Sequence, residues 1–90
     1  MGRLLTEHQA TQIRKLNKEF SKKFPNWMCE GSEDANGNPC NAIFNNDTDE
    51  FFMASYDGKV IGNPNITSVG TAEIIKMADI QGRIRRIANG

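Results

Sequence analysis

Apolar residues recur at helical spacing near both ends of the chain. In the first segment they lie three and four residues apart, at Ala10, Ile13, Leu16, Phe20 and Phe24. This spacing predicts a helix with one apolar stripe. Thr6 and Gln9 form a capping box that predicts where the helix begins. Pro25 predicts its end, because the proline ring disfavours a helical conformation at the preceding residue.

A second helix is predicted to begin near Thr71, with Glu73 favourably placed in its first turn. Its apolar stripe consists of Ile74, Met77, Ile80, Ile84, Ile87 and Ala88. Gly82 interrupts this helix, and a glycine costs about 1 kcal/mol in a helix interior. We therefore expect either a bend or a close contact at Gly82.

Strand-like segments lie between the two helices. Residues 50–56 and 59–61 flank Asp57-Gly58, a strong signal for a hairpin with a two-residue turn. Such a turn places Tyr56 opposite Lys59 and Ala54 opposite Ile61. Residues 42–44 predict a third strand, residues 30–39 consist of turn-forming residues, and residues 27–29 fit either a short strand or an apolar plug.

These elements predict a single α+β domain over residues 1–90, with the order α-β-β-β-α. An N-terminal helix, a three-stranded antiparallel sheet with an Asp-Gly hairpin, and a C-terminal helix follow one another. Both faces of the hairpin are apolar, so the face that the helices leave free needs cover from the Trp27 segment, a second helix or a partner. The expected core comprises Ile13, Leu16, Phe20, Phe24, Trp27, Phe44, Met53, Val60, Ile74, Met77, Ile80 and Ile84.

Charge is distributed unevenly along a chain whose formal net charge is zero. The first 23 residues, Arg3 among them, carry a net charge of +4, and residues 59–90 carry +3. Residues 24–58 contain seven carboxylates and neither lysine nor arginine. Such asymmetry bears on the choice of partner more than on the fold.

Candidate chemistry is sparse, and we expect neither an enzyme nor a bound cofactor. Cys29 and Cys40 fit two free thiols in a reducing compartment or a local disulfide. His8 is the only histidine, and nothing in the sequence places it beside a thiol as an activating base. Two runs have the spacing that opens a calcium loop, beginning at Asp34 and Asn45, but both lack the later ligands. No metal site is predicted.

The chain is expected to be cytoplasmic. It has no run of about 18 apolar residues that could span a membrane. Its first residues also lack the apolar segment of a secretory signal.

We expect a non-enzymatic protein that binds a protein partner with a basic surface. The candidate contact residues are the carboxylates of the acidic segment, forming one charged end of the molecule: Glu30, Glu33, Asp34, Asp47, Asp49 and Glu50. The spare apolar face of the hairpin would add desolvated contact or join a homodimer. Small accessory proteins of phages and mobile elements, anti-CRISPR proteins among them, often inhibit host machinery in this way, and this chain is expected to be such an inhibitor.

The alternative is an RNA- or DNA-binding module that uses the basic faces of the two helices. Its candidate residues are Lys15, Lys18, Lys22, Arg83 and Arg86. The element order is similar to that of double-stranded-RNA-binding domains, and residues 51–78 follow their last strands and helix. The resemblance implies RNA binding. The chain departs from it at Thr71-Ala72-Glu73, where those domains carry a cluster of lysines.

Overall fold

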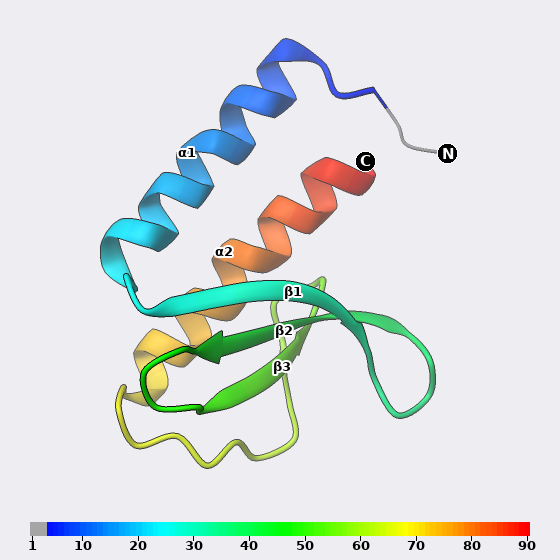
Figure 1. The fold of residues 1–90 in the computed structure, drawn as a ribbon. Coiled ribbons are helices and arrows are strands. Elements are labelled where there is room, and N and C mark those ends of the chain that lie inside the picture. The colour runs from blue at the N-terminus through cyan, green and yellow to red at the C-terminus, as the bar shows by residue number, and fades with distance from the viewer. Residues whose placement is uncertain (1–3) are drawn as a thin grey trace.

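The structure is a computed structural model that describes residues 4–90, so Arg3 lies outside the described residues. Its elements follow the order α1 (Glu7–Lys23), β1 (Trp27–Glu33), β2 (Pro39–Asn45), β3 (Phe51–Ser55), β4 (Val60–Ile61) and α2 (Thr71–Asn89) (Figure 1). The predicted α+β class and the two helices are confirmed. The sheet has four antiparallel strands in the order β1-β2-β3-β4, one more than predicted.

The first helix begins at the predicted capping box and ends just before Pro25. The backbone N–H of Gln9 donates to the Thr6 hydroxyl at 3.0 Å, and the Gln9 amide oxygen accepts from the Thr6 backbone at 2.9 Å. Both halves of the predicted capping box are therefore present. The helix ends at Lys23, two residues before Pro25.

The additional strand is β1, which includes residues predicted to be turn. The turn predicted over residues 30–39 is limited to residues 34–38, where the Asp34 carboxylate accepts from the backbone N–H of Asn36 and of Asn38 at 2.9 Å each. Gly37 has φ +80°, which suits a glycine. Polar residues such as Glu30 belong to a strand here because β2 provides a partner for the whole of β1.

The β3–β4 hairpin differs from its predicted register by one residue. Ala54 pairs with Val60, not Ile61, and the N–H of Ser55 donates to the carbonyl of Lys59 at 2.8 Å. The connection therefore has three residues, Tyr56, Asp57 and Gly58. Gly58 has φ +83°, as a three-residue hairpin with a glycine bulge requires.

The core lies between the sheet and the helices. Helix α2 contacts β2, β3 and β4, and α1 packs chiefly against α2, with the two helices side by side (Figure 1). The most enclosed core side chains are Ile43, Phe52, Ala54, Met77, Ala78 and Ile80. Phe44 and Met53, predicted to be core residues, lie instead on the opposite face of the sheet. Both hairpin faces are apolar, so alternation alone did not distinguish them.

Candidate partner-binding surface

The sheet face turned away from α2 carries a row of apolar side chains. Met28 lies opposite Phe44, and Phe44 lies opposite Phe51, so the three are cross-strand neighbours. Met28 is 50% exposed and Phe51 is 63% exposed. Met53 and Ile61 form the next pair on the same face. No described element covers this row, which makes it an unpartnered apolar surface.

Two hollows flank Phe51 on this side of the molecule. One, of about 300 Å³, is lined by Glu30, Phe44, Asp49 and Phe51, among others. The other, of about 480 Å³, lies between Asp49, Phe51 and Ile61 and the segment 63–65. Phe51 thus forms a ridge between two depressions, with carboxylates at their margins. We call this region the outer sheet surface and define it as Met28, Glu30, Ala42, Phe44, Asp49, Phe51, Met53 and Ile61.

The six predicted contact carboxylates do not form one charged end, and that expectation is wrong. Glu30 and Glu33 lie on β1, and Asp34 lies in the β1–β2 turn. Asp47 and Asp49 lie in the β2–β3 turn, at the opposite end of β2. Seven strand residues, or about 20 Å, separate the two turns. Glu30 and Asp49 line the smaller hollow beside Phe51, and Asp49 and Glu50 line the larger one.

Two of the six carboxylates are bonded within the molecule. Glu50, at the start of β3, accepts from the backbone N–H of Thr67 at 2.7 Å, from the Thr48 hydroxyl at 3.0 Å and from the Ser68 hydroxyl. The bond from Ser68 and the others lower the pKa of Glu50 to about 2. Backbone N–H groups of Asn38 and Asn36 likewise lower the pKa of Asp34. Asp34 therefore holds the β1–β2 turn in place, and Glu50 joins the start of β3 to the segment before α2.

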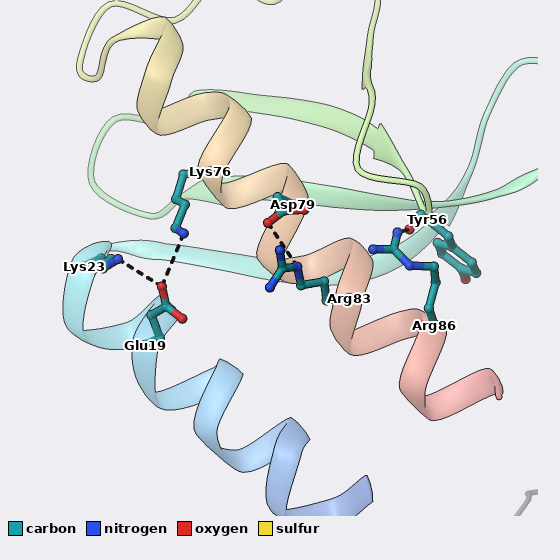
Figure 2. Close-up of polar contacts among 7 residues, drawn as sticks. All are labelled: Glu19, Lys23, Tyr56, Lys76, Asp79, Arg83 and Arg86. Atoms are coloured by element: carbon teal, nitrogen blue, oxygen red, sulfur yellow. Dashed lines mark hydrogen bonds and ion pairs between the residues drawn. The ribbon is translucent and has the colours of Figure 1, made fainter.

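None of the seven carboxylates of residues 24–58 forms an ion pair with a described basic residue. The ion pairs within residues 4–90 are Lys23–Glu19 at 2.9 Å, Lys76–Glu19 at 3.6 Å and Arg83–Asp79 at 3.2 Å. All three join residues of the two helices (Figure 2). Within residues 4–90, the carboxylates of the acidic segment are therefore not neutralised by direct ion pairs.

The alternative site residues lie on the helices. Lys15, Arg83 and Arg86 line a hollow of about 400 Å³ between α1 and α2, and Lys18 and Lys22 extend the basic region along α1. Arg83 is paired with Asp79, and Arg86 donates to the backbone carbonyl of Tyr56 (Figure 2). The predicted basic residues thus share one side of the helical pair, but two of the five are already engaged.

The two thiols and the histidine lie on three different elements: His8 in α1, Cys29 in β1 and Cys40 in β2. Cys29 and Cys40 are both free. Burial raises the pKa of Cys29 to about 11, although Arg85 acts in the opposite direction, so this thiol is protonated at neutral pH. His8 lies exposed in the first turn of α1. Among residues 4–90, no three His, Cys, Asp or Glu side chains are grouped closely enough to hold a metal ion.

The contact between Arg85 and Asn41 was not predicted from the sequence. Arg85 donates from Nε to the Oδ1 atom of Asn41 at 3.0 Å, and Asn41 is fully buried on the helix side of β2. The Nδ2 atom of Asn41 has no hydrogen-bond partner among the described residues. The contact joins residues 44 positions apart, so only the tertiary arrangement reveals it.

Comparison of the chain with protein-family models, with curated proteins and with solved structures finds no match. Within residues 4–90, neither helix combines the length and the apolar character that crossing a bilayer requires.

Proposed function

We propose that the protein is a non-enzymatic binding protein whose outer sheet surface engages a partner protein with a basic surface. The observation that carries this proposal is the exposed Met28–Phe44–Phe51 row with unpaired carboxylates at its margin. An apolar centre with a charged rim is the usual composition of a protein–protein interface.

Charge complementarity determines the kind of partner. Glu30 and Asp49 line the hollow beside Phe51, and neither is paired with a described basic residue. Carboxylates that remain unpaired at a binding surface steer basic partners towards it and repel acidic ones. A second copy docked on the same face would bring these carboxylates close to each other, so a different, basic protein is favoured over a homodimer.

Phe51 is the expected anchor of the interface. It is 63% exposed in the free protein, so a partner can remove most of its ring from water. Burying an exposed aromatic side chain contributes about 1.5–3 kcal/mol, and aromatic residues at the centre of an interface often dominate its affinity.

The test compares two variants that alter charge on opposite sides of the molecule. Wild-type protein, a Glu30→Lys/Asp49→Lys variant and a Lys15→Glu/Lys18→Glu variant are used as baits in extracts of the source organism. Captured proteins are identified by mass spectrometry, and their affinities are then measured with purified components. We expect one basic protein to bind the wild type and the Lys15→Glu/Lys18→Glu variant. The same protein should fail to bind the Glu30→Lys/Asp49→Lys variant. Phe51→Ala should weaken the same complex by roughly tenfold or more.

The second candidate function is nucleic-acid binding through the helices. It is favoured by the hollow between α1 and α2, because Lys15, Arg83 and Arg86 converge there. This reading predicts the reverse ranking of the two variants, and an affinity for RNA or DNA that falls steeply as salt rises. If the Glu30→Lys/Asp49→Lys variant binds the partner normally and the Lys15→Glu/Lys18→Glu variant does not, the proposal for the outer sheet surface is wrong.

A further inference from the structure

Strand β1 is a long, open edge of the sheet. The strand order places β1 and β4 at the two edges, and β4 contains only two residues. Strand β1 has seven residues and pairs with β2 over its whole length without a bulge. Helix α2 makes its main sheet contacts with β2, β3 and β4 and passes behind β1 (Figure 1), but no described strand lies beside the outer margin of β1.

The backbone groups that face this margin follow from the hydrogen bonds at its two ends. Asn46 donates to the carbonyl of Asn26 at 3.1 Å, and Asp34 donates to the carbonyl of Asn38 at 2.9 Å. In an antiparallel pair, residues facing the neighbouring strand alternate with residues facing away. The N–H and C=O groups of Cys29, Gly31 and Glu33 therefore point away from β2, where no described residue bonds them.

Natural sheets usually protect such an edge with lysine, proline, a bulge or a covering segment. Strand β1 contains neither lysine nor proline, and its centre is Gly31, which is exposed and has no side chain to obstruct an approaching strand. The opposite edge is protected, since β4 is short and Pro64 follows three residues later. Only one edge is thus suited to accept a further strand.

Charges near the edge define the segment that fits it. Glu30 projects to the outer sheet surface, while Glu33 lies on the helix side at the end of β1, and Asp34 follows in the turn. On the helix side, the Arg85 guanidinium lies 3.4 Å from the position that a Cβ atom on Gly31 would occupy. Basic side chains therefore fit on the outer side, beside Glu30, and uncharged ones fit beside Arg85.

We propose that the free edge of β1 binds an extended basic segment of the partner protein, which joins the sheet as a fifth strand. This inference rests on the proposed function and specifies the form of the partner. Each of Cys29, Gly31 and Glu33 contributes one donor and one acceptor, while alternate basic side chains of the segment face Glu30. Main-chain bonds then supply affinity and alternate side chains supply specificity. Pairing with a second copy is disfavoured, because it brings the carboxylates of two β1 strands together.

The probe is a blocked synthetic peptide in which lysine and valine alternate, used with two methylated forms of identical charge. One form carries N-methyl groups on its valines, and the other carries them on its lysines. In a strand only one of these two sets of N–H groups faces β1, so methylation of that set abolishes pairing while methylation of the other does not. We expect the wild-type protein to bind the unmodified peptide and one methylated form, and to bind the other at least roughly tenfold more weakly.

Protein variants test the same edge. Gly31→Pro removes only an outward-facing N–H, so the bonds to β2 remain, and Gly31→Ala is the matched control that retains the N–H. We expect Gly31→Pro alone to lose the peptide, with circular dichroism confirming that it folds. If that variant does not fold, hydrogen exchange in the wild-type protein tests whether the peptide pairs with the edge of β1. The N–H groups of Cys29, Gly31 and Glu33 should exchange fast in the free protein and slow down when the peptide is added.

The outcomes separate strand addition from charge attraction. Equal binding of both methylated peptides, or unchanged exchange at Gly31, overturns strand addition even if the Glu30→Lys/Asp49→Lys variant still loses the partner. In that case the proposed function stands without the added strand. Failure of the wild type to bind the unmodified peptide also overturns the inference.

Discussion

Replacing Gly82 with alanine should destabilise the protein, although helix propensity predicts the opposite. Gly82 is buried in α2 and faces the β3–β4 turn. A Cβ atom at this position would lie 2.7 Å from the Tyr56 carbonyl oxygen and 3.0 Å from the Gly58 nitrogen. Both are backbone atoms, so neither can be relieved by a rotation of a side chain. The glycine in this helix therefore marks a close contact.

The expected magnitude follows from two opposing terms. Alanine in place of glycine in a helix interior contributes about 1 kcal/mol of stability. Overpacking a tightly fitted site typically costs about 1–3 kcal/mol, and a contact of 2.7 Å with a backbone oxygen belongs in the upper half of that range. We therefore expect a net loss of about 1–2 kcal/mol, or a melting temperature lower by roughly 5–15 °C for a domain of this size.

Urea denaturation followed by circular dichroism measures the free energy of unfolding of Gly82→Ala. Ile75, which is 55% exposed on the same helix, provides the matched control. Comparing Ile75→Ala with Ile75→Gly measures the propensity difference without a steric term, and alanine should be more stable by about 1 kcal/mol. If Gly82→Ala is also more stable than the wild type by that amount, the close contact with the turn is refuted.

Three further results are expected. Ile43→Ala should lower the free energy of unfolding by about 2–5 kcal/mol, whereas Leu16→Ala, at a half-buried site, should cost clearly less in the same urea titration. Because the pKa of Glu50 is lowered from 4.5 to about 2, its contribution to stability should be present above pH 4.5 and disappear as the pH falls towards 2. The stability difference between the wild type and Glu50→Gln should shrink over that range, and a constant difference would contradict the internal bonding. Since Cys29 and Cys40 are free, adding a reductant should leave the melting temperature unchanged, and a drop of many degrees would reveal a disulfide.

Local chemistry was sufficient to predict the two helices. The capping box at Thr6 and Gln9 satisfies backbone groups within four residues, and Pro25 acts on its immediate neighbour. The apolar stripe of α2 required only its own period, and the helix begins at Thr71 as predicted. Each of these features involves residues close together in the sequence, so no tertiary information was needed.

Strand β1 and the hairpin register depended on contacts that local patterns do not encode. Glu30, Gly31 and Ser32 favour turns by themselves, yet they pair with β2 residues that are eight to twelve positions further along the chain. Asp57-Gly58 correctly indicated a turn. It left open whether that turn has two or three residues, and a change of one residue moves every following side chain to the other face. The inward face was then settled by packing of Phe52 and Ala54 against α2.

The placement of the acidic residues shows why a candidate surface is harder to predict than a fold. Composition identified six carboxylates as equivalent, but Asp34 is bonded to its own turn and Glu50 to the segment before α2, and Asp47 lies about 20 Å from Asp34 along β2. The function of a carboxylate depends on what surrounds it. Counting charged residues does not show which carboxylates accept hydrogen bonds from backbone N–H groups. What distinguishes Glu30 and Asp49 is their position beside the exposed ring of Phe51.

The separation of charge has a consequence for how partners are recognised. The formal net charge is zero, so attraction at long range is weak, and the local field of each surface matters only within about 10 Å at 0.1 M salt. The proposed basic partner would therefore be guided mainly once it is close to the outer sheet surface, where Glu30 and Asp49 would face it and the lysines of α1 would not. Such a complex should form at an ordinary association rate and depend on apolar burial around Phe51 for its lifetime. In the proposed complex, charge would select which protein binds, and the apolar row with the open edge of β1 would determine how long it stays bound.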